Sequence, residues 1–279
     1  MCRLPPGGPA PVAQGGSPVY RLAIAFACLL GTAPLRADDP KPLQRAHAHN
    51  DYEHARPLLD ALECGFCSVE ADVWLVKGQL LVAHTPVQWN TSRTLEKLYL
   101  DPLRDRAKAN RGKIQPGATF YLMIDVKTEA KETYAALAKV LEDYADVLTV
   151  TRDGKTETKA VTVVISGNRD AKTMAEQKTR YAALDGRPSD LGTDPPAALV
   201  PWISDSWKSH FKWDGTGTMP DDERKKLREF VAKVHKQGRK VRFWATPETE
   251  AAWKELLAAD VDFLNTDKLK ELEKFLRDR

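Results

Sequence analysis

This chain has few cysteines and a small net charge, and each of these features argues against a class of protein. Only four of the 279 residues are cysteines, and only Cys64 and Cys67 follow residue 40. Their C-G-F-C spacing has no second cysteine pair to complete a zinc site, so we expect packed or disulfide-forming thiols. The 42 basic and 39 acidic residues nearly balance. No concentrated basic face is evident, which argues against a nucleic-acid partner.

The chain also lacks an apolar run of the roughly 20 residues that a membrane span requires. Its clearest apolar run, 22–30, follows Arg21 and leads through small residues to Ala37 and two aspartates. A basic flank, a short apolar core and a small residue before a polar start are typical of a secretory signal peptide. We therefore expect residues 1–37 to be a cleaved signal. Residues 38–279 would then be exported, periplasmic or secreted, without stable membrane insertion.

Apolar segments of strand length alternate with amphipathic segments over the rest of the chain. We expect strands at 43–47, 68–73, 120–125, 161–165, 181–184, 199–203, 241–244 and 261–264, with a hairpin strand at 79–84. We expect helices at 57–63, 129–144, 171–179, 221–235, 247–258 and 267–276. This alternation predicts an α/β fold, a single-domain TIM (β/α)8 barrel over residues 38–279. The alternative, a doubly wound sheet, lacks its Gly-rich turn after a strand.

Residues capable of chemistry fall near the carboxyl ends of these strands, where TIM barrels carry their active sites. Glu70 and Asp72 lie two apart on one strand, so their side chains point to the same side. Two buried carboxylates repel each other unless a cation compensates them. With Asp125 they form an all-oxygen set that suits Mg²⁺ or Ca²⁺ better than zinc. The alternative is a salt-bridge network with Lys127 or Arg45.

Histidines supply the acid–base candidates, because imidazole titrates near neutral pH. His47 and His49 flank the end of the first strand, and His84 ends the hairpin strand. We expect His54, His210 and His235 to have no catalytic role.

Four motifs give the chain a family resemblance: His47-Ala-His-Asn-Asp-Tyr, Val69-Glu-Ala-Asp-Val, Val82-Ala-His84 and Ile124-Asp-Val-Lys-Thr128. In this order they resemble the phosphatidylinositol-phospholipase-C-like phosphodiesterase superfamily, which includes glycerophosphodiester phosphodiesterases and sphingomyelinase D. The H-A-H-N-D-Y form is most similar to the altered-inheritance-of-mitochondria protein 6-like branch. The usual H-R-G opening of glycerophosphodiesterases is absent.

The resemblance implies a metal-dependent phosphoric diester hydrolase with one Mg²⁺ or Ca²⁺ ion. It implies that Glu70, Asp72 and Asp125 are the metal ligands and that His84 is the second catalytic histidine. Either His47 or His49 is the first. The substrate-binding residues it implies are Lys127, Asn50, Trp244 and Asp267. The substrate would be a small phosphodiester, such as a glycerophosphodiester or a phospholipid headgroup, and the first product could be a cyclic phosphate. The sequence leaves the oligomeric state open.

Two alternatives stay open at the level of sequence. The His47-Ala-His49 pair and Asp267 also suit a zinc amidohydrolase, although such enzymes take further histidines from the fifth and sixth strands, which supply none here. A non-catalytic barrel that binds a phosphorylated ligand is the other alternative, with Trp202, Trp207, Phe211 and Trp213 as an aromatic wall.

Overall fold

The computed structural model describes residues 7–8 and 40–279. The predicted cleavage site at Ala37 and nearly all of the predicted signal peptide therefore lie outside the described residues. Within them, no helix combines the length and apolar character needed to cross a membrane.

Eight parallel strands form the barrel, as the sequence predicts. They are β1 (Leu43–Ala48), β2 (Phe66–Val76), β4 (Phe120–Val126), β7 (Val161–Gly167), β9 (Ala182–Gly186), β10 (Trp202–Ser206), β11 (Lys240–Trp244) and β12 (Leu264–Thr266). Each strand pairs in parallel with the next along the chain from β2 to β11, and β1 lies between β12 and β2. A single parallel bridge between Arg242 and Phe263 joins β11 to the segment before β12. The barrel is therefore nearly closed, and all its carboxyl ends meet at one rim.

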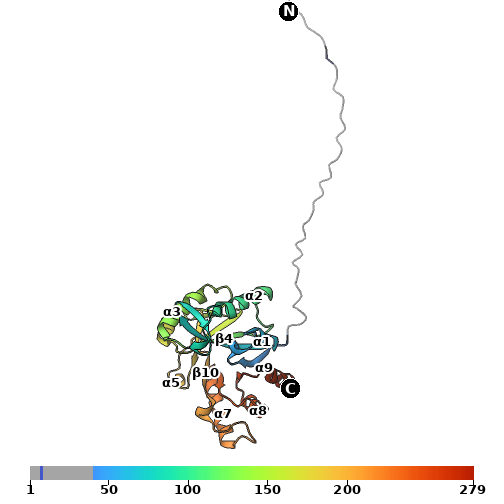
Figure 1. Cartoon of the computed structure of the whole chain (residues 1–279), viewed down its shortest axis with the longest axis vertical. Helices are drawn as coiled ribbons and strands as arrows, with labels where there is room; N and C mark the ends of the chain where they lie inside the picture. The colour runs from blue at the N-terminus through green and yellow to red at the C-terminus, as the bar shows by residue number, and fades with distance from the viewer. Residues whose placement is uncertain (1–6, 9–39) are drawn as a thin grey trace, which may run out of the picture. The chain divides into compact units, whose positions relative to one another are not determined.

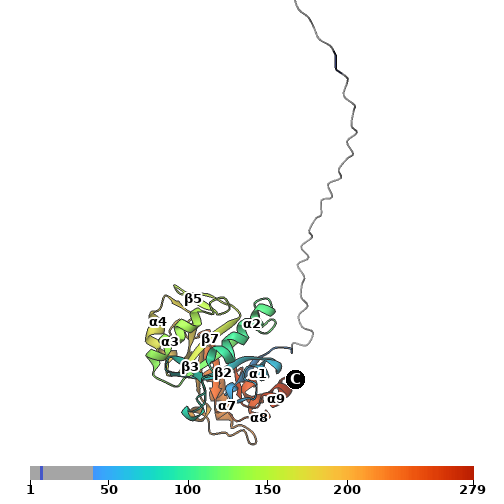
Figure 2. The ribbon, with the colours of Figure 1, turned by 45° about the horizontal axis from the view of Figure 1, so that its top comes forward.

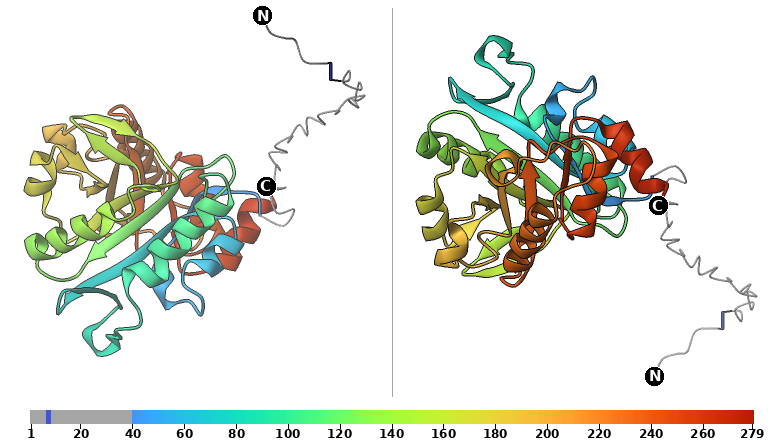
Figure 3. Two further views of the ribbon diagram at one scale, coloured as in Figure 1. Left: turned by 90° about the horizontal axis from the view of Figure 1, so that it is seen from above. Right: turned by 90° about the horizontal axis from the view of Figure 1, so that it is seen from below.

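The helices lie around the outside of the strands (Figures 1 and 3). They are α1 (Leu59–Glu63), α2 (Asp101–Ala109), α3 (Ala130–Glu142), α4 (Ala171–Glu176), α5 (Asp190–Thr193), α6 (Trp207–His210), α7 (Asp221–His235), α8 (Glu250–Ala258) and α9 (Leu269–Arg277). Shorter turns are η1 (Asp51–Glu53), η2 (Pro86–Gln88) and η3 (Glu96–Leu100). The outward apolar faces of the strands pack against these helices in one buried core.

Four strands lie outside the barrel: β3 forms a hairpin with β2, and β5, β6 and β8 form a small sheet of their own. β3 (Gln79–Val82) folds back antiparallel on the end of β2, as the turn at Lys77-Gly78 predicts (Figure 2). A separate antiparallel sheet of β5 (Val150–Arg152), β6 (Lys155–Glu157) and β8 (Thr179–Arg180) is absent from the sequence prediction. Residue 148 bridges to the first residue of β7, so this small sheet lies at the end of the barrel opposite the carboxyl rim.

Inward-pointing residues change from apolar to polar along the barrel axis. At the lower level, the rings of Tyr121, Trp202 and Phe263 pack together with centroids 4.6–5.4 Å apart, and Phe263 meets the other two edge to face. Further along β2 and β4, the inward residues include Glu70 and then the register partners Asp72 and Asp125. A packed aromatic floor therefore lies beneath a polar layer at the carboxyl rim, where the site forms.

The structure differs from the sequence prediction in several element bounds. β9 and β10 run to Gly186 and Ser206, two and three residues beyond the expected ends, and β10 begins three residues later than expected. Helix α2 is also absent from the prediction. Cys64 and Cys67 are buried and free, which favours the packed-thiol interpretation over a disulfide.

Candidate active site

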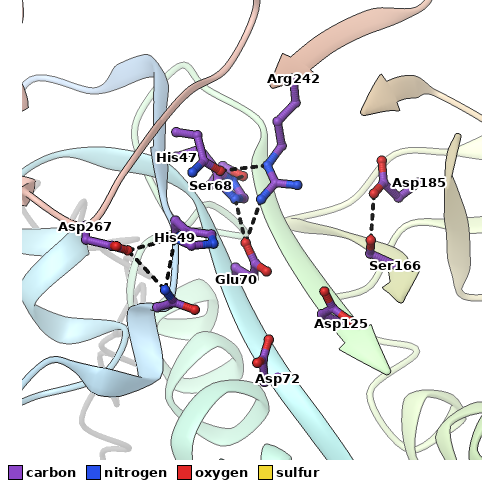
Figure 4. A network of polar contacts seen from close by, with 12 residues as sticks. His47, His49, Ser68, Glu70, Asp72, Asp125, Ser166, Asp185, Arg242 and Asp267 are labelled. Atoms are coloured by element: carbon purple, nitrogen blue, oxygen red, sulfur yellow. Dashed lines mark hydrogen bonds and ion pairs between the residues drawn. The ribbon is translucent and has the colours of Figure 1, made fainter. Parts of the chain in front are cut away.

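Three carboxylates converge at the carboxyl rim of β2 and β4. Glu70 and Asp72 project inward from β2, and Asp125 is the register partner of Asp72 on β4. One oxygen from each lies within 4.8 Å of the others. Glu70 and Asp72 are 4% and 1% exposed. The sequence prediction that these three residues lie together is therefore met by the geometry (Figure 4).

Two cations partly balance these charges. Lys127 Nζ lies 3.1 Å from Asp72 Oδ2 and 3.3 Å from Asp125 Oδ2. Arg242, from β11, donates from Nη2 to Glu70 Oε2 over 2.7 Å. Arg45 instead pairs with Asp260 at the opposite end of the barrel. The predicted salt-bridge network thus exists in part, with Arg242 in the place expected for Arg45, but two cations face three carboxylates.

The surroundings shift the pKa values of the three carboxylates in different directions. Burial alone would raise the pKa of Glu70, but the Arg242 charge and the His47 hydrogen bond lower it to about 2. Burial and the nearby Glu70 charge raise the pKa of Asp72 to about 6, despite Lys127. Burial and Glu70 also raise the pKa of Asp125. Asp72 Oδ1 is buried and has no hydrogen-bond partner. A divalent cation fits this donor set, because oxygen ligands from three carboxylates suit a hard cation.

His49 lies beside the carboxylates and is held by residues after the last strand. Its Nδ1 lies 2.8 Å from Asp267 Oδ1, and Asn50 Nδ2 lies 3.3 Å from the same oxygen. Burial would lower the pKa of His49, but the hydrogen bond to Asp267 and the charge of Glu70 raise it above its ordinary value. Asp267 lies on the side of His49 away from the carboxylates (Figure 4). With Nδ1 bound to Asp267, Nε2 is left for chemistry.

His47 occupies a different position, inside the barrel below the carboxylates. It is 0% exposed. Its Nδ1 lies 2.7 Å from Ser68 Oγ and its Nε2 lies 3.4 Å from Glu70 Oε2. Burial and the Arg242 charge lower its pKa to about 4. Both ring nitrogens therefore have partners within the protein, and the imidazole is neutral at physiological pH.

His84 lies at the rim, two residues after the end of β3. Half of its side chain is exposed. Its Nδ1 lies 2.9 Å from the hydroxyl of Tyr52 and 3.6 Å from Asp72 Oδ2. Tyr52 belongs to η1, which immediately follows the first strand. The two histidines at the rim, His49 and His84, are thus held by Asp267 and by Tyr52, and Asn50 contacts both of these holding residues.

These side chains line a cavity of about 350 Å³. Six residues of its lining come from β7, β9, β10 and β11 or the residues after them: Ser166, Asp185, Arg187, Asp205, Arg242 and Trp244. Arg187 Nη1 donates to Asp185 Oδ2 over 2.7 Å, and Ser166 Oγ donates to the same oxygen over 2.6 Å. Trp244 is 42% exposed. The part of the cavity away from the histidines is therefore polar, with one exposed aromatic ring.

Most predicted site residues meet in this cavity: His49, Asn50, Glu70, Asp72, His84, Asp125, Lys127 and Trp244. His47 and Asp267 contact it only through Glu70 and His49. The sequence prediction missed Tyr52, Arg242, Asp185, Arg187 and Asp205. Tyr52 stood in the quoted H-A-H-N-D-Y motif, and Asp185 and Asp205 lie just past the expected strand ends. β9 and β10 carry no histidine, so the amidohydrolase alternative lacks its further ligands.

The chain matches known phosphodiesterase families and curated relatives. Residues 39–185 match the AIM6-like phosphodiesterase domain, and residues 240–270 match the glycerophosphoryl diester phosphodiesterase family. Altered inheritance of mitochondria protein 6 of Eremothecium gossypii is 31% identical over 288 residues, covering 87% of this chain and 72% of the relative. The homolog from Arthroderma benhamiae is 27% identical over 282 residues, covering 90% and 86%.

Among solved structures, the crystal structure of a glycerophosphodiester phosphodiesterase from Parabacteroides distasonis is similar in fold. Its TM-score is 0.52 at 14% identity, over 86% of this chain and 99% of that chain. At this identity the likeness concerns the fold alone.

Proposed function

The chain belongs to the AIM6-like phosphodiesterase family, within the phospholipase-C-like phosphodiesterase superfamily, and we propose that it is a metal-dependent phosphodiester hydrolase. The observation that carries the proposal is the convergence of Glu70, Asp72 and Asp125 within 4.8 Å, in a cavity that is also lined by His49 and His84. Neither a packed core nor a surface ion pair requires this arrangement, since it leaves a buried carboxylate oxygen without a partner.

We propose that the three carboxylates hold one Mg²⁺ or Ca²⁺ ion. When bound, the ion would neutralise charge on the phosphate oxygens. Lys127 contributes a second positive charge from the same rim. Its pKa is raised, because Asp125 and Asp72 more than offset the effect of burial. It therefore stays charged and can bind a non-bridging phosphate oxygen.

Of the two candidate histidines at the first strand, the geometry favours His49. Its hydrogen bond to Asp267 fixes the Nδ1–H tautomer, so that Nε2 can accept a proton from the attacking hydroxyl or attack phosphorus. His47 has no access to the cavity, and it supports Glu70 from below. His84, which lines the same cavity, would protonate the leaving alcohol.

A small phosphodiester suits the cavity better than an apolar ligand. In the part of the cavity away from the histidines, Arg187 and Asp205 can bind hydroxyl or charged groups of a ligand. The volume of the cavity lies in the range of small-molecule sites. We propose a glycerophosphodiester or a phospholipid headgroup as the substrate class. Export of the protein remains a prediction from the sequence.

The test is a panel of phosphodiesters followed by ³¹P NMR. Glycerophosphoethanolamine, a lysophospholipid and a phosphoinositide headgroup would each be incubated with the purified protein and Mg²⁺ or Ca²⁺. We expect cleavage of at least one, with a monoester or a cyclic phosphate as the phosphorus-containing product. Binding of these ligands without any turnover, at any metal, would instead support the non-catalytic alternative.

A further inference from the structure

Tyr52 ends the H-A-H-N-D-Y motif, but the family resemblance assigns it no role. It lies in η1, and its side chain is almost fully buried, being 3% exposed. Its hydroxyl has three polar neighbours: Asp72 Oδ2 at 2.7 Å, Asn50 Oδ1 at 2.8 Å and His84 Nδ1 at 2.9 Å. One oxygen atom therefore touches a carboxylate of the acidic cluster and the exposed histidine beside it.

The count of protons decides how these contacts are made. A tyrosine hydroxyl has one proton to donate and can accept hydrogen bonds at its oxygen. Two of the three neighbours, Asp72 Oδ2 and Asn50 Oδ1, can only accept. When the hydroxyl proton goes to Asp72 Oδ2, the shortest of the three contacts, the contact with His84 is a hydrogen bond only if the Nδ1 atom of His84 carries a proton. This arrangement favours the Nδ1–H tautomer of His84.

Tyr52 also constrains His84 through its aromatic ring, which makes an interplanar angle of 21° with the imidazole. Its ring stacks beside the imidazole of His84, with ring centroids 6.3 Å apart. The imidazole is consequently positioned on one face by a ring and at one nitrogen by a hydroxyl. Its Nε2 has no protein partner among residues 40–279.

We propose that Tyr52 is a positioning residue that fixes His84 as the Nδ1–H tautomer and presents Nε2 to the leaving-group oxygen. This inference rests on the proposed function, because it assigns His84 to leaving-group protonation. The proton that His84 gives up leaves from Nε2 and goes to the leaving oxygen. The Nδ1–H bond to Tyr52 stays intact, so the neutral product tautomer is the one that Tyr52 already stabilises.

The first experiment separates positioning from general structural damage by varying the leaving group. A nitrophenolate leaves without protonation, whereas an alkoxide leaves poorly unless an acid protonates it. At saturating metal, we expect Tyr52→Phe to lower kcat for an alkyl diester such as glycerophosphoethanolamine about 10- to 100-fold, as loss of an acid's orientation does. For bis(p-nitrophenyl) phosphate we expect a change of less than about threefold, because that ester needs little acid. His84→Ala should show the same contrast, more strongly.

Tyr99→Phe is the matched control. Tyr99 is equally buried, and its hydroxyl donates to a buried carboxylate, Asp51 Oδ2, over 2.8 Å, but it does not line the cavity. Both variants delete one buried hydroxyl bound to a carboxylate. We expect Tyr99→Phe to lower the melting temperature without changing the ratio of the two activities. Equal loss on both substrates in Tyr52→Phe would overturn the positioning role.

The second experiment reads the tautomer without any activity. The chain has six histidines, so ¹⁵N-histidine labelling and long-range ¹H–¹⁵N spectra can resolve each ring, with His84→Gln assigning the signal. We expect the neutral His84 ring to be the Nδ1–H tautomer in the wild type and to shift toward Nε2–H in Tyr52→Phe. A wild-type Nε2–H tautomer, or no shift in the variant, would contradict the inference. Failure of every substrate in the phosphodiester panel would refute the proposed function and leave this readout unaffected.

Discussion

His49 and Asp267 are 218 positions apart in the chain, yet His49 Nδ1 lies 2.8 Å from Asp267 Oδ1. The pairing of β1 with β12 explains this, because Ala48 is the register partner of Thr266 and the next residue on each strand follows in step. The backbone N–H of His49 also donates to the carbonyl oxygen of Thr266 over 3.0 Å. Closure of the barrel therefore sets the orientation of the proposed base.

The same substitution at the two neighbouring histidines distinguishes their roles. We expect His49→Gln to lower kcat at least ~100-fold, the usual scale for loss of a general base, with little change in melting temperature. We expect His47→Gln to keep at least about a tenth of kcat and to lower the melting temperature, because His47 is buried against Ser68 and Glu70. Steady-state kinetics and thermal unfolding of both variants check this. The reverse pattern would assign the base to His47.

The charge of Asp267 predicts a shift in the pH profile. Its hydrogen bond helps raise the pKa of His49, and a base works only when unprotonated. Activity of the wild type should therefore fall as the pH drops through this raised pKa. In Asp267→Asn the pKa of His49 falls, so the acidic limb of kcat/KM should move to lower pH while the plateau rate decreases. A limb that stays in place would show that His49 does not govern it.

Gly167 supports Asp125 from the neighbouring strand. Its φ is +66°, and a Cβ there would lie 2.1 Å from Asp125 Oδ1 and 2.4 Å from the carbonyl oxygen of Val126. We expect Gly167→Ala to displace Asp125 and lower both metal affinity and kcat. Gly154→Ala is the control, since Gly154 has φ +78° but open space around it. Both should lose about 1–2 kcal/mol from backbone strain. Gly167→Ala should lose further stability through its clash with the Val126 backbone, and only this variant should lose activity. Equal activities would contradict this reading.

Asp51 makes stability depend on pH. Burial raises its pKa to about 7, while the ordinary value is about 3.9. Between these two pKa values the folded state binds the proton more tightly than the unfolded state. The stabilisation that this proton provides is fully present at low pH and is lost as the pH rises through the folded-state pKa of about 7. Asp51→Asn removes the titration. We expect the variant to gain roughly 2 kcal/mol over wild type between pH 5 and pH 8, measured by urea unfolding at both values. If the gain in stability were the same at both pH values, the titration of Asp51 would not be the cause of the pH dependence.

The sequence predicted the barrel because its strands are short apolar runs that end in polar residues. The same rule placed the ends of β9 and β10 too early. In a barrel whose upper interior is polar, Asp185 still belongs to its strand, although its charge looks like a strand end. Helix α2 was missed because it buries only Leu103 and Ala107, which leaves little periodic apolar signal.

The acidic cluster was predictable from spacing, whereas its partners were not. Glu70 and Asp72 lie two positions apart on one strand, so both side chains point inward. Asp125 lies near the end of the neighbouring parallel strand, and the register of the two strands brings the three carboxylates together. Arg242 lies 172 positions from Glu70, and nothing local marks it as a partner. Tyr52 reaches His84 only through the turn of η1. Contacts of this kind depend on the closed barrel and on side-chain directions, which one sequence does not encode locally.

The most direct test of the central claim is the metal dependence of bis(p-nitrophenyl) phosphate hydrolysis by the purified protein and by Asp72→Asn. We expect wild-type activity to disappear with EDTA and to return with Mg²⁺ or Ca²⁺, while Asp72→Asn stays folded and at least ~100-fold slower at any metal concentration. Activity that survives EDTA, or that Asp72→Asn retains, would contradict a metal-dependent phosphodiesterase built on Glu70, Asp72 and Asp125.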